Sequence, residues 1–152
     1  MGDVSCRTAT EADLPAVAAL LADDSIGQGR ESAADMAPYR TAFRAMAAQG
    51  GNDLYVAVDD AGGIVGCFQL TLIPGVSLMG AVRAQIEGVR IAPAARGTGL
   101  GEQMIRWAVD RAREEGAALV QLTSDLRRAD AIRFYERLGF VHSHAGMKLP
   151  LN

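Results

Sequence analysis

The sequence predicts a mixed α/β fold with helices on both faces of one sheet, and three observations predict it. The chain has 152 residues, which suits one compact domain, residues 1–152. Its apolar residues recur every three or four positions near the N-terminus, then alternate with period two in the middle of the chain. In the last third, strand-like and helical segments alternate, which is typical of a β-α-β unit with two parallel strands.

The expected element order is β-α-α-β-β-β-α-β-α-β. The strands are apolar runs bounded by turn residues, and they cover Cys6–Arg7, Leu54–Val58, Ile64–Leu72, Ala84–Ala92, Leu119–Leu122 and the run from Val141 onward. The helices carry apolar residues on one face, and they run over residues 14–21, 35–49, 99–115 and 131–138. Glycines mark the ends of the last three of these helices.

Composition and charge exclude several classes of protein. With 49% hydrophobic and 22% charged residues, the chain resembles folded proteins and not disordered ones. The net charge of −3 and the lack of any Lys/Arg run argue against binding nucleic acid. No segment approaches the roughly 20 apolar residues that span a bilayer, and the N-terminus has no secretory signal. We therefore expect a cytoplasmic protein without a membrane partner.

The cysteines and histidines indicate no metal site. Cys6 and Cys67 are far apart, form no C-x-x-C pair and have no histidine at ligand spacing, so we expect two reduced, packed thiols. His142 and His144 alternate on the last predicted strand and share one face. We expect a solvated or packed pair there and no metal ligand set.

The most informative motif is a glycine-rich turn between a predicted strand and a predicted helix, Arg96-Gly97-Thr98-Gly99-Leu100-Gly101. We call residues 96–101 the glycine turn. Glycine allows positive φ and lets a ligand approach the backbone. The first N–H groups of the following helix favour an anion, and Arg96 adds a full charge. The motif predicts a diphosphate site; the alternative is a tight turn that needs glycine only for packing.

Two common diphosphate motifs do not fit the glycine turn. A Walker A loop ends in Gly-Lys-Ser/Thr, whereas Gly101 is followed by Glu102 and Gln103. A dinucleotide fingerprint, G-x-G-x-x-G counted from Gly97, would place its last glycine at Glu102. It would also follow the first strand of the fold, whereas this turn lies far along the chain.

The glycine turn matches the [QR]-x-x-G-x-[GA] signature of the GNAT superfamily of acyl-CoA-dependent N-acyltransferases. Three further segments resemble that family in order and spacing: the strand Ile86–Pro93, the F-Y-x-x-L-G-F helix end Arg133–Phe140, and the opening Arg7–Leu14. The resemblance covers most of the chain. It implies a GNAT-like single domain whose mixed, mostly antiparallel sheet has about six to seven strands, a central splayed parallel pair and about four helices on both faces.

The resemblance implies that the protein binds acetyl-CoA as a co-substrate, and the cysteine and histidine pattern leads us to expect no metal. In this family the pantetheine arm lies along a splayed strand, which implies backbone contacts from Val89, Arg90 and Ile91. The N–H groups expected to bind the pyrophosphate are those of Arg96, Gly97, Thr98, Gly99, Leu100, Gly101 and Glu102.

This chain departs from the family at one coenzyme contact. Many relatives have an Asn seven residues before the family tyrosine, and this chain has Arg128 there. Arg128 either reaches a phosphate or is simply solvated, and both interpretations stay open. Ser124 and Asp130 are further candidate neighbours of the coenzyme.

Glu87 and Tyr135 are the candidate catalytic residues. An alkyl ammonium has a pKa near ~10, so a base must remove a proton before the nitrogen attacks. Glu87 is expected to share a strand face with Gln85 and Val89. In similar family members a Glu at this place acts as the general base, usually through a water molecule. Otherwise it faces solvent or an arginine. The resemblance implies that Tyr135 is the general acid near the coenzyme sulfur; the alternative is a core residue beside Phe134.

The expected function is direct transfer of an acetyl group from acetyl-CoA to a primary amine of a small molecule or peptide. No nucleic-acid partner is expected, and a homodimer is left open. One alternative is a non-catalytic acyl-CoA sensor, which needs the glycine turn but neither Glu87 nor Tyr135. Another is a different phosphate-binding enzyme, such as a nucleotide hydrolase, which the lack of a Lys in the turn disfavours.

Overall fold

The computed structural model describes residues 4–26, 29–32 and 34–152. Its contacts divide the chain into two compact units, Met1–Gln121 and Leu122–Asn152, and each is described by itself. The described strands are β1 (Ser5–Thr8), β2 (Asn52–Val58), β3 (Ile64–Ile73), β4 (Arg83–Ile91) and β5 (Leu119–Leu122). The described helices are α1 (Leu14–Ala22), α2 (Ala37–Gln49), α3 (Ser77–Gly80), α4 (Leu100–Glu114) and α5 (Ala129–Arg137), with short 3₁₀ turns η1 (Glu11–Asp13) and η2 (Pro93–Ala95).

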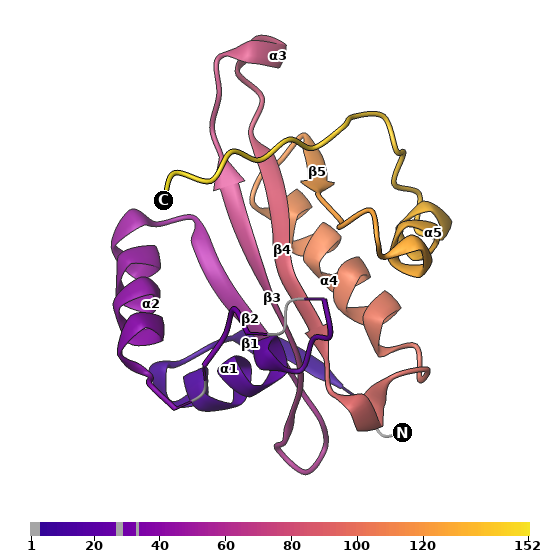
Figure 1. Ribbon diagram of the computed structural model, residues 1–152. Coiled ribbons are helices and arrows are strands. Elements are labelled where there is room, and N and C mark those ends of the chain that lie inside the picture. The colour runs from indigo at the N-terminus through magenta and orange to yellow at the C-terminus, as the bar shows by residue number, and fades with distance from the viewer. Residues whose placement is uncertain (1–3, 27–28, 33) are drawn as a thin grey trace. The chain divides into compact units, whose positions relative to one another are not determined.

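The described strands form one sheet in the order β1-β2-β3-β4-β5 (Figure 1). The first four are antiparallel, each to the next. β5 follows α4 and runs parallel to β4, because the Ala118 N–H donates to the Val82 carbonyl at 2.8 Å and, three residues further along both chains, Gln121 donates to Gln85. The predicted mixed, mostly antiparallel sheet is therefore confirmed.

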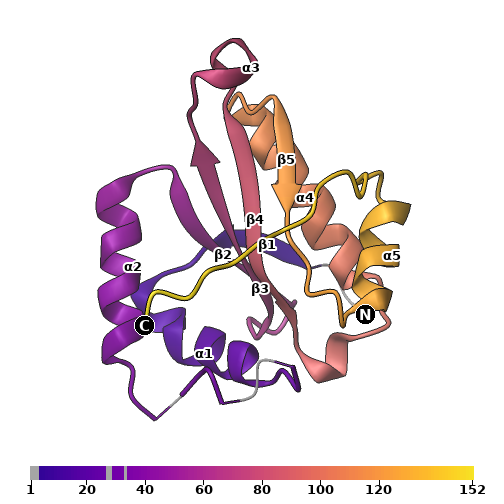
Figure 2. The ribbon, with the colours of Figure 1, turned by 45° about the horizontal axis from the view of Figure 1, so that its top comes forward.

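Different helices cover the two faces of this sheet within the first unit (Figure 2). On one face the cross-strand pair Tyr55 and Phe68 stacks at 5.3 Å between ring centroids, and Trp107 of α4 contacts both rings at 5.1 and 6.0 Å. On the opposite face α1 packs into an apolar cluster whose buried members are Ala9, Val17, Leu20, Val56 and Cys67. The expected helices on both faces are confirmed for α1 and α4.

The helical periodicity of the sequence is confirmed in α2 and α4. Four residues of the predicted α4 face are at most 1% exposed, namely Leu100, Met104, Ala108 and Ala112. The predicted α2 face is half-buried through Tyr39, Phe43 and Met46, while its other residues are exposed. α2 begins at Ala37, two residues after the expected start, and ends at Gln49, which Gly50 follows with φ +72°.

The strand expected from Val141 onward is not formed, so the described sheet has five strands and not six to seven. Residues 140–152 are irregular, and Val141 is 82% exposed. Its carbonyl accepts a local hydrogen bond from the Ser143 N–H at 2.9 Å. Alternation of apolar and polar residues does not make a strand without a neighbouring strand to accept its hydrogen bonds.

The short turn α3 lies at the tip of the β3–β4 hairpin (Figure 1). Leu78 and Met79 have φ of 54° and 58°, in the left-handed region that side chains rarely adopt. Val76 and Met79 are almost fully exposed. The tip therefore combines backbone strain with exposed apolar surface.

In the second unit, α5 presents an aromatic cluster. The rings of Phe134 and Tyr135 lie edge to face at 5.2 Å, and Phe140 meets Tyr135 at 5.7 Å. The Arg137 guanidinium lies 5.9 Å from the Phe134 ring centroid.

Across the described part of the chain, no helix has both the length and the apolar character needed to span a membrane.

Candidate coenzyme and catalytic site

The strand β4 contains a bulge between Glu87 and Arg90. Arg90 pairs with Cys67 on β3. Three positions earlier on β4, Glu87 pairs with Gln69, which is only two positions after Cys67. Two residues of β4 therefore oppose one of β3, and Gly88 takes φ +61°, as bulges often require of glycine. A glycine inside the predicted strand was the sequence signal for this bulge.

The bulge changes which side chains share a face of β4. Directly opposed residues of antiparallel strands point to the same face, and Cys67 and Gln69 are on one face of β3. Glu87 therefore shares its face with Arg90. The expectation that Val89 lies on the Glu87 face is wrong, because the extra residue of the bulge breaks the period of two.

Side chains fix the carbonyl groups of the bulge. Cys67 Sγ donates to the Gly88 carbonyl at 3.7 Å, and Arg90 Nη1 donates to the Val89 carbonyl at 2.8 Å. Cys67 is 1% exposed, and burial raises the pKa of its thiol to about 12. Burial also raises the pKa of Cys6 to about 11. Both cysteines are free, and a raised pKa favours the protonated thiol over the nucleophilic thiolate.

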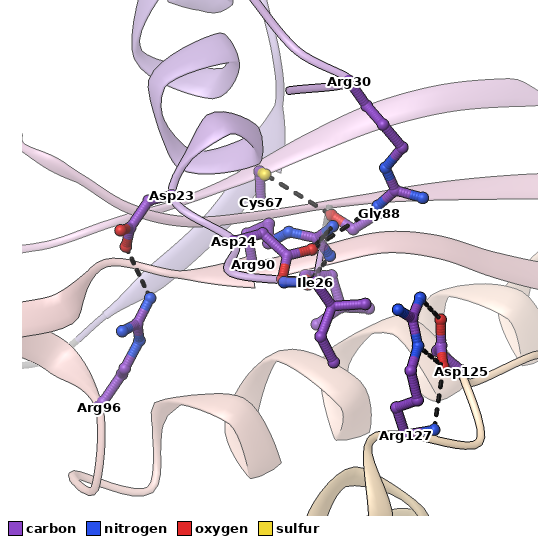
Figure 3. Close-up of polar contacts among 11 residues, drawn as sticks. Asp23, Asp24, Ile26, Arg30, Cys67, Gly88, Arg90, Arg96, Asp125 and Arg127 are labelled. Carbon is purple, nitrogen blue, oxygen red and sulfur yellow. Dashed lines mark hydrogen bonds and ion pairs between the residues drawn. The ribbon is translucent and has the colours of Figure 1, made fainter. Parts of the chain in front are cut away.

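A buried ion pair joins the end of α1 to the bulge (Figure 3). Asp24 Oδ2 accepts from Arg90 Nη2 at 2.9 Å, and the Asp24 side chain is only 4% exposed. The same oxygen lies 3.7 Å from Arg30 Nη2, and Asp24 Oδ1 accepts from the Ile26 N–H at 3.1 Å. Arg90 Nε is buried and has no hydrogen-bond partner among the residues that the structure describes. The pair anchors the segment after α1 against the strand expected to hold the pantetheine arm.

The glycine turn has the backbone geometry that a phosphate site needs. Gly97 and Gly99 take φ of +75° and +85°, and a Cβ built on either would meet no atom within 4 Å. The first helical hydrogen bond of α4 runs from the Gln103 N–H to the Gly99 carbonyl at 3.1 Å. The N–H groups before Gln103 have no partner inside the helix. Open space over these donors fits the linked phosphates of a coenzyme.

Charged side chains flank the glycine turn. Arg96 Nη2 donates to Asp23 Oδ2 at 2.7 Å, and both side chains are about half exposed (Figure 3). Glu102, in the first turn of α4, accepts from Arg106 Nε at 2.8 Å. Arg96 is thus held by a carboxylate beside the turn, in a surface pair that a phosphate can replace at little energetic cost.

Glu87 is exposed and takes part in no ion pair or hydrogen bond with the residues that the structure describes. Its cross-strand neighbour is Gln69, and Gln85 lies two positions before it on the same face. Of the alternatives to a catalytic role, exposure to solvent is met, and no arginine among the described residues binds Glu87. A solvated carboxylate with free lone pairs can accept a proton from a bound molecule or from a water.

The second unit holds the other predicted residues. Arg128 precedes α5, and its N–H donates to the Asp125 carbonyl at 2.8 Å. A cavity of about 380 Å³ lies at this helix start and is lined by Arg127, Arg128, Ala129, Asp130 and Ala131. Asp130 pairs with Arg133. The Arg127 guanidinium binds the Asp125 carboxylate (Figure 3) and holds the pKa of Asp125 well below its usual range. Ser124 is half-buried.

Of the predicted site residues, those from Glu87 to Glu102 lie in the first unit, and Ser124, Arg128, Asp130 and Tyr135 lie in the second. Sequence reasoning missed Asp23 and Asp24, which bind arginines of the glycine turn and of β4. Two consecutive carboxylates after a helix were their only signal. Among the described residues no His, Cys, Asp and Glu cluster could hold a metal, and His142 and His144 are exposed.

The mixed sheet, with a glycine turn between β4 and the N-terminus of α4, defines an α/β protein whose turn is open to a ligand. The chain belongs to the acetyltransferase (GNAT) family, whose family model matches residues 16–140. That match runs across the boundary between the two units.

Two curated relatives of the chain are named as acetyltransferases. Over 141 residues, the chain is 31% identical to the L-methionine sulfoximine/L-methionine sulfone acetyltransferase of Pseudomonas paraeruginosa, covering 90% of this chain and 79% of that protein. A 60-residue segment is 40% identical to the aminoalkylphosphonate N-acetyltransferase of Salmonella typhimurium, covering 40% of this chain and 39% of that protein. The chain therefore spans well under half the length of the Salmonella relative.

One solved structure is similar over almost the whole chain. The crystal structure of a transcriptional regulator from Bacillus halodurans C-125 matches with a TM-score of 0.93 and 44% sequence identity. The match covers 98% of this chain and 100% of that one. The predicted fold class is confirmed by this likeness and by the family match.

Proposed function

We propose that this protein is an N-acetyltransferase that moves the acetyl group of acetyl-CoA directly to a primary amine of a small molecule or peptide. The observation that carries the proposal is the glycine turn. Its backbone is open at Gly97 and Gly99, it leads into the N-terminus of α4, and it carries Arg96. Membership of the acetyltransferase (GNAT) family supports the same activity.

The coenzyme would be held by backbone groups of the first unit. The N–H groups from Arg96 to Glu102 would bind the linked phosphates, and Arg96 would leave Asp23 to add its charge. The backbone of Val89, Arg90 and Ile91 would bind the pantetheine arm and offer an N–H to the acyl oxygen. When bound, acetyl-CoA supplies an acyl group activated as a thioester.

Glu87 is the proposed general base. It is exposed and, among the described residues, has no partner, so its carboxylate can take a proton from the acceptor ammonium through a water. Tyr135 is the proposed general acid, with its phenol Oη giving a proton; the motif resemblance supports this role. Ser124, Arg128 and Asp130 remain proposed neighbours of the coenzyme on the same ground.

Small amines are the first acceptors to test. The Salmonella relative is named for aminoalkylphosphonates and the Pseudomonas relative for L-methionine sulfoximine and L-methionine sulfone. We propose acceptors of this kind for the present chain and no nucleic-acid or membrane partner. We further propose a single catalytic domain over residues 1–152 and a cytoplasmic location, which two free cysteines support.

The experiment is an assay of thiol release from acetyl-CoA with aminoethylphosphonate, L-methionine sulfone and a short peptide as acceptors. We expect turnover with at least one, and a fall of roughly 100-fold in kcat for Glu87→Gln and Tyr135→Phe with an unchanged coenzyme Kd. Glu114→Gln, an exposed change on α4, is the control. Unchanged rates in both variants would remove these two roles.

A second candidate function is a non-catalytic acyl-CoA-binding module. The observation that favours it is the likeness to a protein described as a transcriptional regulator. This alternative predicts coenzyme binding in calorimetry without turnover of any acceptor. A protein that binds neither coenzyme A nor acetyl-CoA would contradict both functions.

A further inference from the structure

The face of the sheet that carries Glu87 also carries a row of polar side chains. These residues share that face by strand register and are half-buried: Asn52 on β2, Gln69 and Thr71 on β3, and Gln85 on β4. The opposite face at the same level is apolar, with Leu70, Ala84 and Ile86 at 3% exposure or less. A polar row on one face only, beside a solvated carboxylate, points to contact with a polar molecule.

Asn52 determines how the Gln69 amide is turned. Asn52 Nδ2 donates to Gln49 Oε1 at 2.9 Å, which leaves Asn52 Oδ1 as an acceptor. That oxygen accepts from Gln69 Nε2 at 2.8 Å and from Thr71 Oγ1 at 3.1 Å. The chain of donors fixes the amide orientation, because the Thr71 hydroxyl and the Gln69 NH₂ group can both donate to the same oxygen.

Gln69 therefore presents its Oε1 away from β2. β3 lies between β2 and β4, so an amide whose nitrogen is bound toward β2 has its oxygen free on the side of β4. Glu87 is directly opposite Gln69 on β4, and opposed residues have Cβ atoms about 5 Å apart. No hydrogen bond to Gln69 Oε1 comes from the described residues. A carboxylate and an amide oxygen thus lie side by side, and both only accept.

We propose that Gln69 Oε1 and the Glu87 carboxylate together bind the ammonium group of the acceptor, with Asn52 as the positioning residue that keeps the Gln69 oxygen turned toward it. This inference rests on the proposed function, since it adds a binding residue to the same acceptor site. An alkyl ammonium has three donors and no acceptor, so it matches two adjacent oxygens and a water. The acceptor class is a primary amine that arrives protonated.

The test measures amine binding without any reaction. Aminoethylphosphonate and methylammonium are titrated separately into protein saturated with coenzyme A, and the Kd of each is measured. We expect Gln69→Leu to weaken binding of the amines by about tenfold, as for loss of a hydrogen bond to a charged group. The Kd of coenzyme A and the Tm stay unchanged. An unchanged amine Kd in Gln69→Leu, or no binding of either amine by the wild type, overturns the inference.

A second pair of variants tests the positioning role. Asn52→Leu removes the acceptor of the Gln69 NH₂ group and should weaken amine binding about threefold or more, because the amide is then free to rotate. Asn52→Asp keeps that acceptor and should restore binding. Failure of Asn52→Asp to restore binding would overturn the role of Asn52. Turnover of the same amines is followed in parallel: amine binding with no turnover contradicts the proposed function and leaves this inference standing.

Discussion

Asp23 and Asp24 are consecutive carboxylates at the end of α1 that bind two different arginines. Asp23 Oδ2 accepts from Arg96 at 2.7 Å with its side chain 49% exposed. Asp24 Oδ2 accepts from Arg90 at 2.9 Å with its side chain 4% exposed. One ion pair is therefore in water beside the glycine turn, and the other is buried beside the bulge of β4. We therefore expect the two pairs to contribute differently to stability.

The first prediction compares stability. Asp24→Asn leaves the charge of Arg90 buried without its carboxylate, and removing one partner of a buried pair costs about 3 kcal/mol of unfolding free energy or more. Asp23→Asn breaks an exposed pair and should cost less than about 1 kcal/mol. Urea denaturation of the two variants and the wild type measures both. Equal losses would show that burial of Asp24 does not decide its contribution.

The second prediction concerns the coenzyme. Arg96→Gln removes a charged donor from the glycine turn and should weaken coenzyme A binding about tenfold. Asp23→Asn releases Arg96 and should tighten binding by up to about fivefold, the range of an exposed ion pair. Calorimetry measures both, with Arg113→Gln, an exposed change at the far end of α4, as the control. Tighter binding by Arg96→Gln would place the phosphates elsewhere.

The third prediction tests the backbone of the glycine turn. Gly99 has φ +85°, so Gly99→Ala should cost about 1–2 kcal/mol of stability although the space around it is open. Gly75→Ala is the matched control, because Gly75 also has open space and its φ lies outside the left-handed region. Thermal denaturation compares the two. If Gly99→Ala left the Tm unchanged, the left-handed conformation of Gly99 would not be required for the stability of the turn.

The fourth prediction is a pH dependence of stability. The Arg7 guanidinium, through hydrogen bonds of 2.7 and 3.0 Å, lowers the pKa of Asp13 from 3.8 to about 2. A depressed pKa gives stability that is present above pH 3.8 and is lost as the pH falls toward 2. Asp13→Asn should therefore cost about 1–2 kcal/mol at neutral pH, since Arg7 is partly exposed, and little near pH 2.

Denaturation of Asp13→Asn at pH 2, 4 and 7 measures this dependence. Asp60→Asn, in the exposed β2–β3 turn, serves as the control and should change little at any of these values. A difference from wild type that is the same at pH 2 and pH 7 would show that the Asp13 charge does not matter.

Local pattern predicted the elements well where a single buried face decides the structure. The helix expected over residues 99–115 is confirmed in α4, because helical spacing of apolar residues, from Leu100 to Ala112, is visible in the sequence. The prediction of a strand from Val141 onward was wrong for the converse reason. A strand also requires hydrogen bonds from a neighbouring strand, and alternation does not supply that neighbour.

The candidate site also has some features that the sequence predicts and others that only the tertiary structure sets. The sequence by itself determined the glycine turn, since left-handed glycines before a helix N-terminus are local features, and it named Glu87 as a candidate base. Only the tertiary structure decided that a bulge turns Arg90 to the face of Glu87, that Asp24 is buried against it, and that Asn52 orients Gln69. These contacts join residues from different strands and helices. The partner of each side chain is set by strand register and by burial, and no local sequence pattern encodes either.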